Sequence, residues 1–466
     1  MGPKARPKCR LATVSPHKLR IQNPEDAYVW QKSGSFHLLH YSSTFKQLGG
    51  LTSRRAGKHP DMDLGKVCFY IHRFQIIELN SYITLEMDFK TNMKSWMEKL
   101  LKNENIDNLD VAILGNSEKG DGYMGDIVFA EVKGTTTEGI CKKYNIALKC
   151  SKSSPSLREK SSVKEAFLNE IYFYDVIFPS FKKFQQDRKI DKLFENVPIC
   201  YGTLSNGNME VLALENLKSK GYILWNKAKP LTRKHIDMIV AEYGKFHAIS
   251  IAMKDQEPRA FQKLIDGIEN MFKKFQETCD IVNVYERIFD EIYNLLKNEL
   301  DEDILDKWQG FKLQLRTFLF QISEHVEGEN VILHGDCWNN NFMHYHKNDQ
   351  PSTFAILDWQ LIRYSSPVFD LSYLLFACLS EEDIYDMEQI KKHYHESLLE
   401  HLEKLGSCTS LYPICLAETN EIPDVGEAAD KGDDIATGFG QPIKNTTDYK
   451  KRMKYIIKYA AENNLI

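Results

Sequence analysis

The stretch His334-Gly335-Asp336 is followed by Asn341, five residues after the aspartate, and by Asp358, 17 residues after the asparagine. A carboxylate can accept the proton of an attacking hydroxyl group, while a second carboxylate and a carboxamide can hold a divalent metal ion. A loose, anionic phosphoryl transition state requires this combination, because the metal neutralises charge and positioning supplies most of the remaining catalysis. The spacing therefore predicts phosphoryl transfer at a loop that places these groups around one point.

The His-Gly-Asp sequence alone has a second interpretation, an ordinary turn whose aspartate caps a helix. Two further features favour catalysis. Asn341 stands at the offset found in the H-R-D-x-x-x-x-N loop of protein kinases, and Asp358 ends the next expected strand, where kinases carry a metal-binding aspartate. We therefore predict that Asp336 is the catalytic base and that Asn341 and Asp358 are ligands of Mg²⁺.

A lysine at the end of an apolar strand is the next chemical signal. Lys149 ends the run Ile146-Ala147-Leu148-Lys149, similar to the V-A-I-K pattern whose lysine contacts the α- and β-phosphates of ATP. We expect its partner to be Glu170, beside the apolar face of the following helix, with Glu165 as the rival. The alternative is that the lysine and the glutamate are both solvated surface side chains.

Three glycines precede a predicted strand. Gly120, Gly122 and Gly125 form a G-x-G-x-x-G sequence, which is weak evidence by itself. A dinucleotide-binding fold would need a helix after the glycines, but the residues at 127–132 are β-prone. This order favours a kinase-type loop whose backbone N–H groups cover the phosphates, with a flexible hairpin turn as the alternative.

The elements that must position these residues fall into two groups. Residues 1–80 show no regular period, and we expect an extension there. Strand-like runs follow, at 109–114, 127–132, 144–150 and 211–214. From Thr232 onward helical apolar stripes dominate. This change predicts an α+β chain with a small β-rich N-lobe over 81–215 and a larger helical C-lobe over 216–466.

The helical part contains one strand-like island, in which runs at 341–345 and 353–357 predict a hairpin leading to Asp358. Helices are expected at 258–280, at 281–300, at 303–326, after Ser366-Pro367 and at about 448–462. The stretch 421–442 is rich in Asp, Glu and Gly and is expected to be a loop. The junction at Glu215-Asn216-Leu217 would be a hinge, and clefts between lobes are common ligand sites.

Several other residues favour structural roles. His344 and His346 alternate along a strand and are interpreted as hairpin side chains, because the sequence places no third metal ligand near them. His247 is expected to be a hydrogen-bonded core histidine. Asp370 is expected to hold the catalytic loop through hydrogen bonds, and Cys337 is not needed as a nucleophile.

Net charge, apolar runs and cysteine spacing argue against a nucleic-acid-binding, membrane-spanning or disulfide-bonded protein. The 466 residues carry a net charge of -5 and the pI is near 6.3, which gives no reason to expect nucleic acid as a partner. The most apolar run, 373–379, is too short to span a bilayer, so no membrane partner is expected. Ten scattered cysteines without a C-x-x-C pair fit free thiols, and we expect a cytoplasmic protein.

Taken together, the chain resembles the ecdysteroid kinase-like family, which is related to choline and aminoglycoside kinases, over roughly residues 90–466. The matching stretches are 120–127, 167–174, Leu214-Glu215-Asn216-Leu217, 334–338, and Asp358-Trp359-Gln360 with Arg363, Ser366-Pro367 and Asp370-Leu371. The resemblance implies a two-lobed, protein-kinase-like fold, ATP and Mg²⁺, and a small hydroxylated acceptor such as a steroid hormone or a xenobiotic. It also implies that the backbone from Glu215 to Leu217 meets the adenine.

Rival functions remain. A catalytically inactive pseudokinase that binds a nucleotide or small lipid would keep this fold, although every expected catalytic residue type is present. A protein kinase is disfavoured because the region after Asp358 is too short for a long activation loop and lacks A-P-E. A metal-dependent phosphatase would need a larger cluster of Asp and His ligands.

Overall fold

The computed structural model describes residues 93–117, 124–207, 209–278, 280–323, 330–407 and 446–463. All of them belong to one compact unit, Phe89–Ile466. The expected extension at 1–80, the glycines Gly120 and Gly122, and the expected loop at 421–442 lie outside the described residues.

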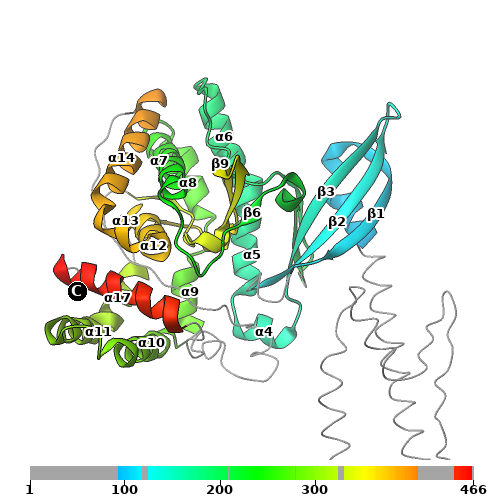
Figure 1. Cartoon of the computed structure of the whole chain (residues 1–466). Coiled ribbons are helices and arrows are strands. Elements are labelled where there is room, and N and C mark those ends of the chain that lie inside the picture. Colours follow the sequence, from blue (N-terminus) through cyan, green and yellow to red (C-terminus); the bar gives the residue numbers. More distant parts are fainter. Residues whose placement is uncertain are drawn as a thin grey trace, which may run out of the picture. The chain divides into compact units, whose positions relative to one another are not determined.

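The N-terminal part of this unit is a five-stranded antiparallel sheet with the strand order β1-β2-β3-β5-β4 (Figure 1). Its strands are β1 (Ile106–Asn116), β2 (Gly125–Thr136), β3 (Cys141–Ser151), β4 (Cys200–Ser205) and β5 (Glu210–Glu215). In β3 buried and half-buried residues alternate from Tyr144 to Cys150, so one face packs on a core while Lys149 faces the other way. The sheet thereby fixes the direction of the Lys149 side chain.

A helical segment connects this sheet to the rest of the unit. It runs from α4 (Pro155–Lys160) to α5 (Val163–Tyr172), then through a π-helical turn (Phe173–Ile177) into α6 (Phe178–Asp187). Figure 1 shows α5 between the sheet and the helical part. Ala166, Phe167 and Glu170 are buried on α5. Single π-turns inside helices occur frequently at functional sites.

The C-terminal part is mostly helical, and its centre is a pair of long helices. The helix α7 (Arg233–Gln256) packs against α14 (Met387–Lys404), and the contact is close at Gly244. A Cβ on Gly244 would lie 2.8 Å from the Tyr394 carbonyl oxygen, so only glycine allows this approach. Thr232 precedes α7 as predicted, but its hydroxyl contacts the His235 ring rather than the helix backbone.

Two small sheets lie beside α7, and their strands lead into the loops that carry Asp336 and Asp358. In one, β6 (Ile223–Leu224) pairs with β8 (Phe342–Lys347), which forms a hairpin with β9 (Gln350–Ile356). In the other, β7 (Val331–Leu333) pairs with β10 (Arg363–Ser365). The helix α12 (Val368–Cys378) follows β10 and ends near α13 (Glu381–Tyr385).

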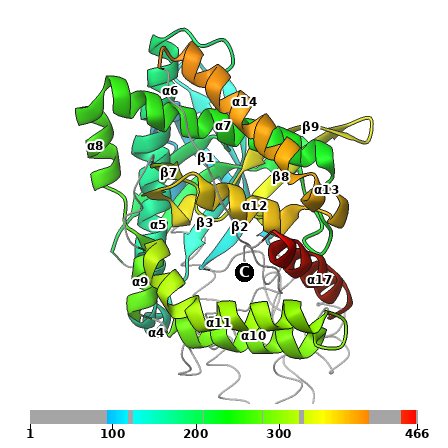
Figure 2. The same cartoon turned by 90° about the vertical axis from the view of Figure 1, so that its left-hand side faces the viewer.

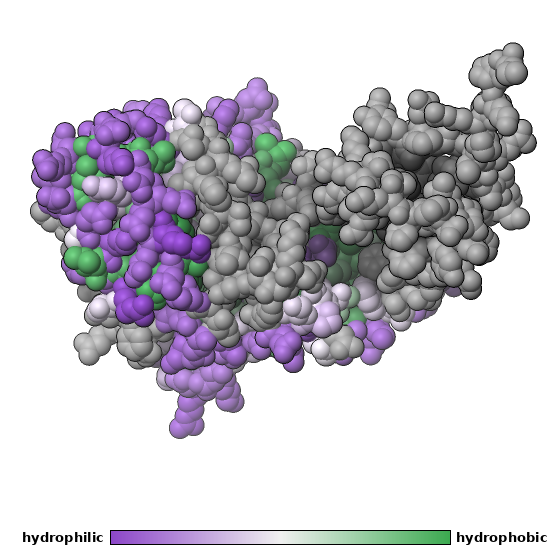
Figure 3. Space-filling view, turned by 90° about the horizontal axis from the view of Figure 1, so that it is seen from below, coloured by the Kyte–Doolittle hydropathy of each residue, from purple (hydrophilic) through white to green (hydrophobic). Residues whose placement is uncertain are grey.

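The remaining helices form a second helical group with its own apolar core. This group comprises α10 (Ile281–Leu296), α11 (Glu302–Ser323) and α17 (Thr446–Glu462), with α9 (Met271–Thr278) beside it and α8 (Pro258–Asp266) leading from α7. Figure 2 shows the group below α12. From below, its outer face is mostly hydrophilic with scattered hydrophobic residues (Figure 3). Leu313 on α11 is an exposed hydrophobic residue of this group.

The element predictions can be compared with this architecture. All four strands expected before residue 215 are present, and so are the hairpin and the helices after Pro367 and near the C-terminus. The single helix expected at 258–280 is instead two helices, because Gly267 interrupts it, and a Cβ there would meet the Tyr172 ring at 2.3 Å. Three short strands (β4, β6, β10) and three helices (α4, α13, α14) were not predicted.

Candidate active site

The loop after β7 is held by a buried carboxylate on α12. Asp370 accepts hydrogen bonds from the backbone N–H groups of His334 (2.7 Å) and Gly335 (2.8 Å), and it lies 3.3 Å from the His247 ring. Burial alone would raise the pKa of Asp370, but these hydrogen bonds and the nearby histidines lower it below its usual value. The predictions for Asp370 and for the buried His247, which also contacts the Tyr394 hydroxyl at 2.9 Å, are confirmed.

Gly335 allows the loop to pass close to another segment. Its φ is +86°, and a Cβ there would lie only 2.1 Å from the Leu361 carbonyl oxygen. A side chain at this position would therefore be strained by both its backbone conformation and its neighbour. The glycine of the His-Gly-Asp sequence is thus required by the fold itself.

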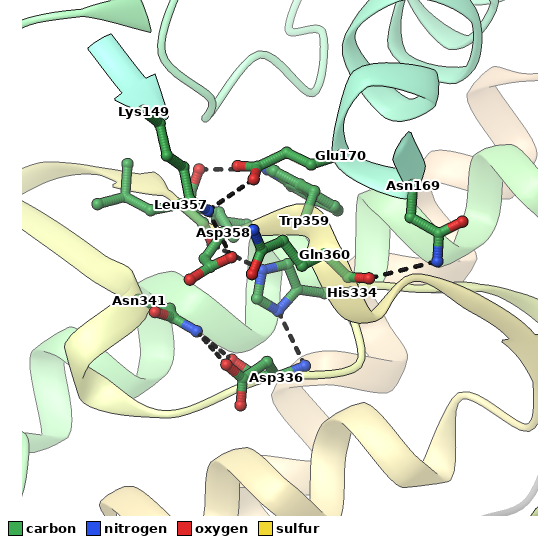
Figure 4. Close-up of polar contacts among 11 residues, drawn as sticks. Lys149, Asn169, Glu170, His334, Asp336, Asn341, Leu357, Asp358, Trp359 and Gln360 are labelled. Carbon is green, nitrogen blue, oxygen red and sulfur yellow. Dashed lines mark hydrogen bonds and ion pairs between the residues drawn. The ribbon is translucent and has the colours of Figure 1, made fainter. Parts of the chain in front are cut away.

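His334 connects this loop to the end of β9. Its Nε2 lies 2.8 Å from the Leu357 carbonyl oxygen, and the Asp336 N–H lies 3.3 Å from its Nδ1. These contacts fit a ring that donates from Nε2 and accepts at Nδ1. The residue before Asp358 and the backbone of Asp336 are thereby held by one imidazole ring (Figure 4).

Asp336 and Asn341 are in direct contact. The Asn341 Nδ2 donates to Asp336 Oδ2 at 2.7 Å and to the Asp336 carbonyl oxygen at 3.0 Å. Burial and the negative charge of Asp358 raise the pKa of Asp336, while His334 and hydrogen bonds from Asn341 and Tyr373 partly oppose the rise. Of these neighbours, the sequence interpretation did not anticipate Tyr373, which lies on α12.

Asp358 adopts a left-handed backbone conformation, with φ of 62° and ψ of 68°. Such a conformation is uncommon for a residue other than glycine, and it occurs often at functional sites. The next residue, Trp359, is buried and stacks on Phe173 of the π-helical turn with ring centroids 3.7 Å apart. The turn that carries Asp358 is therefore packed directly against the helical segment after α5.

Lys149 lies between two carboxylates. Its Nζ is 2.6 Å from Glu170 Oε2 and 2.6 Å from Asp358 Oδ1 (Figure 4). Glu170, rather than the rival Glu165, is the glutamate in contact with the lysine. Burial and the charge of Asp358 raise the pKa of Glu170 to about 7 despite the opposing effect of Lys149.

One cavity contains all these groups and continues under the sheet. Lys149, Glu170, Asp336, Asn341 and Asp358 line its polar end. Its other walls are mostly apolar and come from both parts of the unit: Ile127, Phe129, Ala147, Leu214, Met343 and Leu357. The carboxylate and amide oxygens at the polar end are ligands of the type that Mg²⁺ prefers, and apolar walls suit a purine ring, so the lining fits both groups.

Three further predicted residues also line this cavity, namely Gly125, Glu215 and Leu217. Gly125 begins β2, and a Cβ there would meet the Cys150 carbonyl oxygen and the Phe167 ring, each at 2.6 Å. Glu215 and Leu217 flank Asn216 where β5 leaves the sheet. The N–H groups of Glu215 and Asn216 donate to the carbonyl oxygens of Ile199 and Asn145, at 2.8 and 2.9 Å.

The structure adds a neighbour to the hairpin histidines. His235 on α7 approaches His346 with the two Nε2 atoms 3.2 Å apart, and its ring lies 4.3 Å from that of His344. This third histidine comes from an element more than 100 residues away, so the sequence gave no local signal for it. In the described ranges, no group of three or more His, Cys, Asp or Glu side chains has an arrangement that could hold a metal ion.

The sequence model of the ecdysteroid kinase-like family matches residues 119–407, which is well over half of the chain. The matched range contains all five residues at the polar end of the cavity. The chain belongs to the ecdysteroid kinase-like family. This result confirms the resemblance seen in the sequence. The β-rich part, the helical part and the family membership together show the predicted two-lobed, kinase-like α+β fold.

We also compared this chain with curated proteins and with solved structures. A search of curated proteins finds no match. The GDP complex of aminoglycoside 2′-phosphotransferase-IIIa is 13% identical, with 80% of this chain and 99% of that chain covered and a TM-score of 0.36. Macrolide 2′-phosphotransferase from Brachybacterium faecium is 14% identical over 75% of this chain and 98% of that one, with a TM-score of 0.29. In the described ranges, no helix combines the length and apolarity needed to cross a membrane.

Proposed function

We propose that this chain is a kinase that transfers the γ-phosphoryl group of ATP to a hydroxyl group of a small molecule, with a steroid or a xenobiotic as the acceptor. The observation that carries this proposal is the convergence of Lys149, Asp336, Asn341 and Asp358 on one cavity. Lys149 is almost 190 residues or more from Asp336, Asn341 and Asp358 in the sequence. Only the fold brings it to the same cavity. Membership in the ecdysteroid kinase-like family supports the acceptor class.

In this proposal the roles follow from contacts. Asp336 accepts the proton of the acceptor hydroxyl, and the Asn341 amide holds its carboxylate in place at 2.7 Å. Asp358 and the Asn341 side-chain oxygen would hold Mg²⁺, which neutralises phosphate charge when bound. Lys149, fixed by Glu170, contacts the non-terminal phosphates. The raised pKa of Asp336 suits a base that must take up a proton.

The opposite end of the cavity is assigned to the purine. The N–H groups of Glu215 and Asn216 are both engaged with backbone carbonyls, so the hinge N–H proposed for the adenine is that of Leu217. Gly125 would bring the backbone of β2 close to the phosphates. The lobes themselves are proposed to divide at this hinge, as 81–215 and 216–466, with the acceptor site in the C-lobe.

The test is phosphate transfer from labelled ATP with Mg²⁺, using ecdysteroids, other hydroxylated sterols, choline and phenolic xenobiotics as acceptors. The Asp336→Asn variant is run alongside, with Asp349→Asn as a control in the hairpin turn. We expect transfer to one acceptor class, reduced about 10²- to 10⁴-fold in Asp336→Asn but not in the control. ATP binding without transfer to any acceptor would favour the pseudokinase, and normal turnover by Asp336→Asn would reject the assigned base.

A further inference from the structure

Gln360 lies two residues after Asp358 and lines the same cavity. The residue is only 5% exposed. The side-chain Nε2 is buried and has no hydrogen-bond partner within the described part of the chain. Gln360 is thus a buried amide donor that the roles assigned above leave unused.

The position of Gln360 is fixed by its backbone. Its carbonyl oxygen accepts a hydrogen bond of 3.3 Å from Asn169 Nδ2, and Asn169 also donates to the Glu269 carbonyl at 2.8 Å. The preceding Trp359 is stacked on Phe173. Figure 4 shows the Gln360 side chain extending from this anchored backbone toward Asp358.

An unpartnered donor in such a place calls for an explanation. Buried polar groups are nearly always hydrogen-bonded, because a buried donor without a partner loses the hydrogen bonds that it made with water. An apolar side chain of similar length would fill the space without that cost. The charged residues that line the cavity include the carboxylates of Glu170, Asp336 and Asp358 and the ammonium of Lys149, with Glu215 and Lys218 also in the lining. A neutral N–H donor among them can meet an anionic oxygen without bringing another charge.

We propose that Gln360 is a phosphate-binding residue whose Nε2 donates a hydrogen bond to a non-terminal phosphate oxygen of a nucleoside di- or triphosphate. The side chain stands beside the Lys149–Asp358 contact, where the proposed function puts the non-terminal phosphates. The inference rests on that proposed function. It adds a second, uncharged donor to the lysine.

The experiment measures dissociation constants by calorimetry for ATP, ADP and adenosine, each with Mg²⁺, in the wild type and in Gln360→Met. Methionine keeps the length of the side chain and removes the amide. We expect about tenfold weaker binding of ATP and ADP, unchanged binding of adenosine, and a melting temperature equal to or above that of the wild type. A residue with a purely structural role would instead lower the melting temperature.

Two further variants sharpen the result. Gln360→Glu keeps the shape but turns the donor into an acceptor, so it should weaken ATP binding more than Gln360→Met does. Gln262→Met removes an exposed amide on α8 that contacts Asp266, and it should change none of the constants. Equal loss of ATP and adenosine binding, or no loss at all, would overturn the role of Gln360 and leave the kinase proposal standing. A wild type that binds neither ATP nor ADP would overturn both.

Discussion

The ammonium group of Lys149 lies 2.6 Å from a carboxylate oxygen of Asp358, although the two residues are 209 positions apart. One comes from β3 of the N-terminal sheet and the other from the turn after β9, so this contact joins the two parts of the fold. Burial alone would lower the pKa of Lys149, but the carboxylates of Asp358 and Glu170 outweigh that effect and raise it. One lysine therefore faces two carboxylates, with Asp336 as a third acid nearby, and the excess of negative charge suits a divalent cation.

Replacing Lys149 with alanine should weaken ATP binding at least tenfold and reduce turnover. The change removes the proposed phosphate contact and also leaves the buried Glu170 and the half-buried Asp358 without their cation. Calorimetric titration with Mg²⁺-ATP measures the affinity, and the phosphate-transfer assay measures turnover.

The matched control is Lys143→Ala on the same strand. Lys143 is half exposed and pairs with Glu131, so its loss should leave ATP affinity unchanged. Equal effects of the two substitutions would mean that Lys149 has no particular role in nucleotide binding.

How much of the site the sequence could predict depends on how local the signal is. Asp336 and Asn341 were predictable because a fixed offset along one loop places them together. Glu170 was predictable from helical spacing, although only the structure separates it from Glu165. These predictions concern geometry, and the chemical roles stay proposals.

The other features of the fold and of the site depend on tertiary contacts, which produce no periodic pattern in the sequence. The stacking of Trp359 on Phe173 and the bond from Asn169 to Gln360 each join elements about 190 residues apart. The short strands β6 and β10 have only two and three residues, too few for an alternating pattern. Tertiary pairing, rather than local preference, determines such strands.

Gly335→Ala should destabilise the protein by more than about 2 kcal/mol and reduce turnover. Its positive φ costs a non-glycine residue about 1 kcal/mol, and the added Cβ would also clash with the Leu361 carbonyl at 2.1 Å. Relief of the clash would displace the backbone next to Asp336. Urea unfolding measures the free energy of unfolding of the purified variant.

A second glycine serves as the control. Gly310 lies within α11, and a Cβ there would have no atom within 4 Å. Gly310→Ala should therefore stabilise the protein by up to about 1 kcal/mol through helix propensity. If Gly335→Ala were as well tolerated as Gly310→Ala, the close approach of Gly335 to the Leu361 carbonyl oxygen would be wrong.

Asp370→Asn should lower the free energy of unfolding by about 2–4 kcal/mol. An asparagine oxygen can replace only part of the carboxylate that receives the N–H groups of His334 and Gly335, and its amide would point a donor at other donors. The comparison is Asp187→Asn, which breaks an exposed pair with Lys183 and should cost less than about 0.5 kcal/mol. Denaturant unfolding of both variants, at the same pH, decides whether Asp370 holds the loop.

The pH dependence of turnover should report Asp336. Its carboxyl must be ionised to accept a proton, and burial together with Asp358 raises its pKa above the ordinary aspartate value. As the pH falls through this raised pKa, the group is protonated and kcat/KM is lost, whereas above it kcat/KM reaches a plateau. The acid limb of the profile should therefore lie at a higher pH than an unperturbed aspartate would give.

Tyr373→Phe tests the same limb from the opposite direction. The hydrogen bond from Tyr373 favours the ionised form and so lowers the pKa of Asp336. Without it, the acid limb should move to higher pH, while the plateau stays within a few-fold of the wild type. Tyr345→Phe, on the exposed side of the hairpin, should leave the limb in place. A limb that stays fixed in Tyr373→Phe, or that moves to lower pH, would show that another group governs it.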